Sequence, residues 1–278
     1  MKQMASIVVL TMVALVMSMS DVAAQPFLDV YLQSLQPASR GSRFSVIEEE
    51  QELHLTGKKL NVRQTYNAHG KILYELGKNS RGGRSSETKW EYTSSGKLLK
   101  RTGERYVNVV GWTTEVVEFH YNDSSEHLEG IVHTVGDGFS QRADVRCDST
   151  GMPVEAKVYN TKGTLINIER VIRIPASNCI RVTRHTPSGL FSGSYNYPID
   201  PKEPVPTNNL KREFNEYGDV VLEALEGKLK LNQAYYYEYE YDSQGNWTTR
   251  HTYSCSIAQG NKPRNKKLEY TVVRKITY

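Results

Sequence analysis

A recurring turn signature constrains the fold of this chain more than any other feature. At seven places, an aromatic or similar strand residue is followed four positions later by glycine. These glycines are Gly70, Gly96, Gly151, Gly163, Gly189, Gly218 and Gly245, and the first residues are Tyr66, Tyr92, Cys147, Tyr159, His185, Phe214 and Tyr241. The stretch Tyr121-Asn-Asp-Ser-Ser125 has the form of a further copy without its glycine. Self-similarity of this kind is typical of a repeat architecture.

The spacing of the copies predicts a β-hairpin as the repeating unit. The first residues are separated by 26, 29, 26, 12, 26, 29 and 27 residues, so one unit near residues 147–159 is compressed. In each copy the first residue ends a strand, polar residues enter a turn, and glycine supplies the positive φ that closes it. We therefore expect an all-β fold, an antiparallel meander of repeated hairpins that forms an extended twisted sheet.

The tyrosine content agrees with a β-sheet. The chain has 18 Tyr against 6 Phe, and tyrosine suits half-buried, pleated surfaces. Strict alternation places Tyr235, Tyr237, Tyr239 and Tyr241 on one face of a strand, with acidic residues on the other. Residues 247–257 and 266–278 are predicted to add two strands, which complete a terminal meander.

Only residues 27–35 have helical periodicity, with Phe27, Val30, Tyr31 and Leu35 on one face, and we expect this short helix to cap the end of the sheet. Residues 77–86 and 256–267 have the composition of flexible loops. Four prolines in the segment 197–209 oppose strand or helix, and this segment is interpreted as a long loop within one sheet or as an interdomain linker. The expected organisation is a signal peptide at 1–24, the helix and first strand at 25–59, and the repeat domain at 60–278.

The first residues have the order of a secretory signal. Lys2 precedes an apolar run from Ile7 to Met17, and Val22-Ala23-Ala24 forms a small-residue cleavage site, so cleavage is expected after Ala24. The run is shorter than the ~20 residues that a membrane-spanning helix needs. The sequence thus predicts an exported protein, periplasmic or secreted and soluble after cleavage, with no stable membrane span.

Charge and cysteine content narrow the partners and the chemistry. The net charge of +4 is low for a dedicated nucleic-acid-binding protein, so no nucleic-acid partner is expected. Cys147, Cys179 and Cys255 would allow one disulfide and one free thiol in an oxidising compartment. Three buried free thiols are an equal alternative, and the sequence does not choose between them.

One copy of the signature is close to a known repeat. The stretch Tyr239-Glu-Tyr241-Asp242-Ser-Gln-Gly245-Asn246-Trp247 resembles the tyrosine-aspartate, or YD, repeats of the RHS family. The other copies are looser, because Asn or Thr often replaces the aspartate. Weak resemblance to these repeats extends over residues 60–278. The chain is similar in this respect to short exported bacterial proteins with degenerate YD repeats. It implies the repeat architecture and an envelope location, and it implies no reaction.

No motif with an attached mechanism is present, so the sequence predicts neither an enzyme nor a cofactor. His127, Glu129 and His133 are the best metal candidates, but an extended strand would hold the two histidines ~20 Å apart, too far to share an ion. Glu238, Glu240 and Asp242 are acids at strand spacing. They fit a solvated sheet face that pairs with basic neighbours better than a glycosidase pair.

Two classes of function follow. The first is a non-catalytic envelope protein whose repeat sheet binds an unknown protein or glycan or acts as a scaffold, with Tyr235, Tyr237, Tyr239 and Trp247 as the binding row. The same row is also explained as a face that packs internally. The alternative function is a secreted hydrolase acting on an envelope or extracellular polymer, with catalytic residues drawn from distant turns.

Overall fold

The computed structural model describes residues 27–35, 45–107, 110–136, 138–199, 210–225, 234–257 and 262–278. They form helix α1 (Phe27–Leu35), a short 3₁₀ turn (Pro175–Ser177) and one sheet of seventeen strands. The first nine strands are β1 (Val46–Leu53), β2 (Lys58–Tyr66), β3 (Ile72–Lys78), β4 (Arg84–Tyr92), β5 (Leu98–Val107), β6 (Gly111–Tyr121), β7 (Leu128–Val135), β8 (Phe139–Cys147) and β9 (Pro153–Tyr159). The others are β10 (Leu165–Ile174), β11 (Cys179–His185), β12 (Phe191–Pro198), β13 (Leu210–Phe214), β14 (Val220–Leu225), β15 (Ala234–Tyr241), β16 (Trp247–Ile257) and β17 (Pro263–Thr277).

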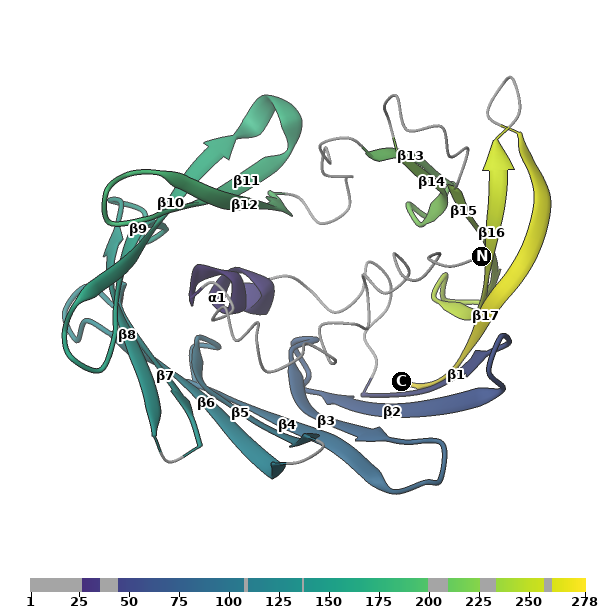
Figure 1. Cartoon of the computed structure of the whole chain (residues 1–278), viewed down its shortest axis with the longest axis horizontal. Helices are drawn as coiled ribbons and strands as arrows, with labels where there is room; N and C mark the ends of the chain where they lie inside the picture. Colours follow the sequence, from purple (N-terminus) through teal and green to yellow (C-terminus); the bar gives the residue numbers. More distant parts are fainter. Residues whose placement is uncertain are drawn as a thin grey trace, which may run out of the picture.

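All strand pairs among the described residues are antiparallel. The ladders join β2 to β12 in sequence order, and β1 lies between β2 and β17, from which the sheet continues back to β13. No ladder joins β12 to β13 within the described residues. The strands therefore curve round α1 and leave the sheet open at these two strands (Figure 1). This confirms the predicted all-β antiparallel meander with a short N-terminal helix.

The repeated signature has one local structure. All seven signature glycines have positive φ, between 73° and 87°, and lie in turns between antiparallel strands. The first residue of each copy pairs with the residue two positions after the glycine, as in Tyr92 with Leu98, and the register shifts beside that pair in all eight copies. In the copy without glycine, Glu126 has the positive φ of 55°. Register shifts of this kind increase the local twist, which favours a curved sheet.

The turns are divided between the two edges of the sheet. Alternate strands run in the same direction, so the turns that begin at Tyr66, Tyr92, Tyr121, Cys147, Phe214 and Tyr241 share one edge, which we call the tyrosine edge. The turns beginning at Tyr159 and His185 lie on the opposite edge. The signature moves to the opposite edge across the compressed spacing of 12 residues, between Cys147 and Tyr159, and returns to the tyrosine edge between His185 and Phe214.

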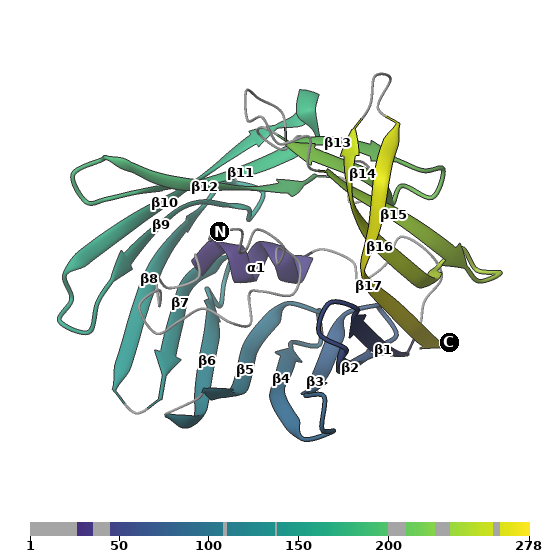
Figure 2. The same ribbon diagram turned by 45° about the vertical axis from the view of Figure 1, so that its right-hand side comes forward.

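Helix α1 lies in the concavity of the sheet (Figures 1 and 2). Its Leu28 and Leu32 are buried, and they belong to one hydrophobic core with residues of β5 to β9, β11 and β12. The carboxylate of Glu169 in β10 accepts hydrogen bonds from the amides of Phe27 and Leu28, at 3.1 and 2.9 Å. These are two of the amides that a helix leaves unpaired at its start. The helix therefore packs against the concave face of the sheet. The expectation that it caps the end of the sheet is wrong.

Two predicted loops are shorter than expected. Residues 79–83 form a tight turn between β3 and β4, where Asn79 Oδ1 accepts the amides of Arg81 and Gly83, and Gly82 has positive φ. Strand β3, which leads into this turn, ends at Lys78 and not at an aromatic residue, so the similarity to the other turns was not evident from the sequence. The predicted loop at 256–267 is also shortened, because β16 ends at Ile257 and β17 begins at Pro263. Strand β12 continues through Pro198, into the proline-rich segment. The predicted signal peptide, the rest of the proline-rich segment and residues 258–261 lie outside the described residues.

Candidate functional site

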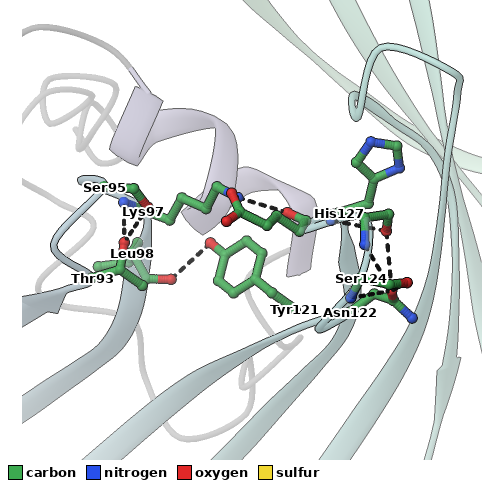
Figure 3. Close-up of polar contacts among 10 residues, drawn as sticks. Thr93, Ser95, Lys97, Leu98, Tyr121, Asn122, Ser124 and His127 are labelled. Atoms are coloured by element: carbon green, nitrogen blue, oxygen red, sulfur yellow. Dashed lines mark hydrogen bonds and ion pairs between the residues drawn. The ribbon is translucent and has the colours of Figure 1, made fainter.

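Neighbouring turns on the tyrosine edge are joined by the residue that follows the glycine. Lys97 donates from Nζ to the backbone oxygen of Glu126 at 2.8 Å and to its carboxylate at 2.6 Å, and Nζ lies over the ring of Tyr121 (Figure 3). Lys71 makes the matching contacts one hairpin earlier, with the backbone oxygen of Gly96 and the ring of Tyr92. These two lysines thus join three successive turns, those that begin at Tyr66, Tyr92 and Tyr121.

The most elaborate of these contacts joins the last two copies. Tyr217 stacks on Tyr241, with ring centroids 4.0 Å apart and planes inclined by 21°. The Tyr241 hydroxyl donates to the carboxylate of Asp219 at 2.8 Å and accepts from the amide of Asn215 at 2.7 Å. Tyr217 also lies beside Gly245, where a Cβ would be 3.9 Å from its ring. The Tyr217 side chain nevertheless remains 45% exposed.

A second exposed tyrosine adjoins this pair. The hydroxyl of Tyr278, which follows β17, donates to the carboxylate of Asp242 and accepts from the amide of Asn246 at 2.9 Å. Tyr278 is 53% exposed. The tyrosine cluster, as we call it, consists of Tyr217, Tyr241, Tyr278, Asp219 and Asp242. It combines exposed aromatic rings with carboxylate and amide groups, which are the groups that bind the faces and hydroxyls of sugars.

The titratable groups of the cluster have shifted pKa values. Burial, together with the negative charge of Asp219, raises the pKa of Tyr241 despite the hydrogen bond from Asn215. Burial acts to raise the pKa of Asp242, but hydrogen bonds from Tyr278 and from the amides of Asn246 and Gln244 outweigh it and hold that pKa below its usual value. Asp242 is therefore an ionised hydrogen-bond acceptor at neutral pH and a poor proton donor.

The four residues of the predicted binding row lie on one face of β15 and β16, and that face is the inner one. Residues paired directly across a ladder lie on the same face of the sheet. Trp90 packs against the core, and when its face is followed from strand to strand through β3, β2, β1 and β17, it is the face of Arg250 in β16. Arg250 pairs with Tyr239, so Tyr239 also lies on the inner face. Burial raises the pKa of Tyr239 to about 12, and also raises those of Tyr235 and Tyr237. The sequence pattern gives the shared face but not the curvature that turns it inward.

Internal contacts occupy much of this row. The Tyr239 hydroxyl donates to the backbone oxygen of Val220 at 3.0 Å, and its ring meets Trp247 edge to face at 6.0 Å. The guanidinium of Arg274 lies 3.3 Å from the centre of the Trp247 ring and donates to Glu49 at 2.5 Å. Tyr239 and Trp247 are thus used for internal packing. The exposed rings nearby are those of Tyr217 and Tyr278, at the tyrosine edge.

A second polar group lies under α1. Glu115 in β6 is 2.8 Å from Nε2 of His133 in β7 and 3.0 Å from Nη2 of Arg101 in β5. Although burial acts to raise the pKa of Glu115, the hydrogen bond from His133 and the charges of Arg101 and His133 lower it to about 2. The adjoining cavity, lined in part by Phe27 and Val30, has a volume of about 10 Å³, room for about one water molecule. This space does not admit a substrate.

The other predicted residues are dispersed. The carboxylate of Glu129 accepts a hydrogen bond from Asn122, whereas His133 faces Glu115, so the structure does not bring these metal candidates together. Within the described residues, no three His, Cys, Asp or Glu residues are grouped as metal ligands. Glu238 pairs with Lys266 at 2.9 Å, which lowers its pKa. Cys147, Cys179 and Cys255 are all free thiols.

Sequence reasoning missed Tyr217 and Tyr278. Tyr217 occupies the position just before the signature glycine, and the other copies have His, Ser, Thr, Lys, Ser and Gln there. This single aromatic residue in a turn position was the available signal. Tyr278 carries no comparable signal, because its place beside Asp242 results from the pairing of β16 with β17.

Comparison with known proteins gives structural similarity only. No protein-family model and no curated protein sequence matches the chain. Among solved structures, a porin-like protein from Bacteroides uniformis matches with 12% identity and a TM-score of 0.44, over 85% of this chain and 98% of that one. The complexes TcdB2-TccC3-Cdc42 and TcdB2-TccC3 each match at 10% identity, with TM-scores of 0.27 and 0.29, over 76% of this chain and 15% of theirs. No helix in the described part of the chain is long and apolar enough to cross a lipid bilayer.

Proposed function

We propose that this chain is an exported, non-catalytic glycan-binding protein of the cell envelope whose binding site is the tyrosine cluster. The observation that carries this proposal is the exposure of Tyr217 and Tyr278 beside two carboxylates that are already held by hydrogen bonds. Aromatic rings fixed in this way offer apolar faces to a sugar ring at little entropic cost. The neighbouring acids and amides are then available to sugar hydroxyls.

The charge of the cluster limits the class of glycan. Asp219 and Asp242 lie within it, and Glu216 adjoins Tyr217 in the same turn. No Lys or Arg occurs in the turn segments 215–219 and 242–246. An anionic polymer would meet like charge here, whereas a neutral sugar or an amino sugar would not. The favoured ligands are therefore glycans of neutral or amino sugars.

The chemistry of the cluster supports binding over hydrolysis. A glycosidase needs a carboxylic acid that stays protonated near neutral pH to donate to the leaving group. Asp242 has a lowered pKa, and Glu238, the acid singled out in the sequence, is paired with Lys266 and also has a lowered pKa. Glu169 has a pKa raised by burial, but it lies beneath α1, bonded to helix amides. The secreted-hydrolase alternative therefore has less support.

Binding should first be measured on an array of envelope polysaccharides and peptidoglycan fragments, followed by calorimetry with the glycan retained best. Tyr217→Ala should weaken binding at least tenfold, because aromatic anchors contribute most of such binding energy. Tyr195→Ala is the matched control, since Tyr195 is 41% exposed on β12, outside the tyrosine cluster. Equal losses in both variants, or retention only of anionic polymers, would contradict the proposal. Release of sugar fragments by the purified protein would favour the hydrolase.

Export is tested separately. The intact mass of the protein recovered from the periplasm or the medium should correspond to a chain that begins at Gln25. A protein that keeps residues 1–24 and sediments with membranes would contradict this part of the proposal. Glycan binding by the purified protein does not depend on that result.

A further inference from the structure

The edge opposite the tyrosine edge carries exposed apolar side chains at the ends of three hairpins. Leu55, in the turn between β1 and β2, is 76% exposed. Leu190, in the turn between β11 and β12, is 68% exposed, and Phe191, the first residue of β12, is 63% exposed. The hairpin between β5 and β6 adds Tyr106 and Trp112, paired edge to face and 56% and 43% exposed, with Val110 at 51%. We call this the apolar edge.

The two edges differ in both apolarity and charge. The turns of the tyrosine edge contain six acids and two lysines, namely Asp123, Glu126, Asp148, Glu216, Asp219 and Asp242 with Lys71 and Lys97. The exposed large apolar residues near this edge are Tyr217 and Tyr278, together with Leu73 and Leu99, the second residues of β3 and β5, which are 38% and 40% exposed. The apolar edge instead carries exposed basic residues around its hairpin ends, namely Lys58, Lys59, Lys78, Arg81, Arg84, Lys162, Lys262 and Arg264. The small net charge of the chain therefore conceals a separation of charge between its edges.

Several of these cations are not neutralised locally. Lys59 pairs with Glu50 and Glu52, and Arg84 with Glu87 and Glu104. By contrast, Lys78, Arg81 and Lys162 have no carboxylate within ion-pair distance in the part of the chain that the structure describes. Arg81 lies in the β3/β4 turn, between the apolar ends of the β1/β2 and β5/β6 hairpins. Positive charge thus alternates with apolar tips along the edge.

We propose that the apolar edge binds the surface of an anionic phospholipid bilayer. Separate apolar tips can each enter the boundary between headgroups and acyl chains, while lysine and arginine between them contact lipid phosphates. Trp112 and Tyr106 are of the types enriched at that depth. A protein partner fits less well, because the core of a protein interface is a continuous apolar patch with few charges. Here the basic β3/β4 turn interrupts the apolar side chains.

The test uses the full processed chain in flotation assays with two vesicle types, phosphatidylcholine alone and phosphatidylcholine mixed with phosphatidylglycerol. We expect flotation with the mixed vesicles and little with phosphatidylcholine alone. The double variant Leu190→Ser/Phe191→Ser should lower the vesicle partition coefficient at least tenfold. Arg81→Glu should lower it roughly fivefold or more, and added salt should weaken binding by the wild type.

Control variants on the tyrosine edge separate lipid binding from general loss of exposed apolar surface. Tyr217→Ser and Tyr278→Ser remove comparable exposed rings and should leave the partition coefficient unchanged. Circular dichroism of every variant should match the wild type, since all the altered side chains are exposed. Equal loss in the Tyr217→Ser control, equal binding to both vesicle types, or no flotation of the wild type would overturn the proposal.

Discussion

At the scale of single residues, the second position of the signature explains why the copies look degenerate. The side-chain oxygens of Asn67, Asp148 and Asp242 each accept hydrogen bonds from the amides two and four residues later. Thr93 and Thr186 make only the second of these bonds. Asp, Asn and Thr are therefore interchangeable here because each offers a hydrogen-bond acceptor to the turn.

The glycines allow a test of backbone conformation free of packing effects. Gly163 has a φ of +75° and Gly193 lacks a positive φ, and a Cβ at either position would have no atom within 4 Å. Gly163→Ala should lower the free energy of unfolding by about 1–2 kcal/mol, since an L-residue is strained at positive φ. Gly193→Ala should be neutral or slightly stabilising, because it restricts the unfolded chain. Urea unfolding measures both, and equal changes would contradict the conformational argument.

At the scale of elements, prediction from sequence succeeded where the signal is local. The spacing of Phe27, Val30, Tyr31 and Leu35 gave the bounds of α1. Its location did not follow, because its partners, such as Ile131 and Val182, come from distant strands that only the curved sheet brings together. The aromatic row shows the same limit. Alternation gave its shared face, and only the direction of curvature decides which face is internal.

The ion group beneath α1 joins three strands and gives a pH-dependent stability. The Glu115 carboxyl has a pKa of about 2 in the folded protein, below its ordinary value of 4.5. Its contribution is therefore fully present above about pH 5 and is lost as the pH falls through 4.5 toward 2. Glu115→Gln should lower stability at pH 7 by roughly 2 kcal/mol and reduce the acid-side decline. Urea unfolding from pH 7 to pH 3 measures this, and parallel pH profiles for both proteins would contradict it.

At the scale of the whole molecule, strand number explains the opening in the sheet. Seventeen antiparallel strands in a ring would leave β12 and β13 running in the same direction, so the alternating pattern cannot continue across them. The sequence indicates this opening between β12 and β13 only indirectly. The proline-rich segment marks the position, but the repeat spacing of 29 residues is the same across it as between Tyr92 and Tyr121. Spacing reports the repeating unit, whereas closure depends on the total number of strands.

The opening should be visible in amide exchange. Strand β12 has one ladder partner among the described residues, β11, whereas β7 is paired on both sides with β6 and β8. Amides of β12 that point away from β11 are exposed to water, and an edge strand frays more easily than an internal one. The free energy of local opening is therefore lower for β12, and its amides exchange faster. Hydrogen exchange measured by mass spectrometry should therefore show peptides from β12 exchanging at least tenfold faster than those from β7.

The β3 strand, paired with β2 and β4, is the control for a doubly paired strand of similar length, and its exchange should resemble that of β7. Equal protection of β12 and β7 would mean that another segment completes the ladder and that the sheet is not open in solution.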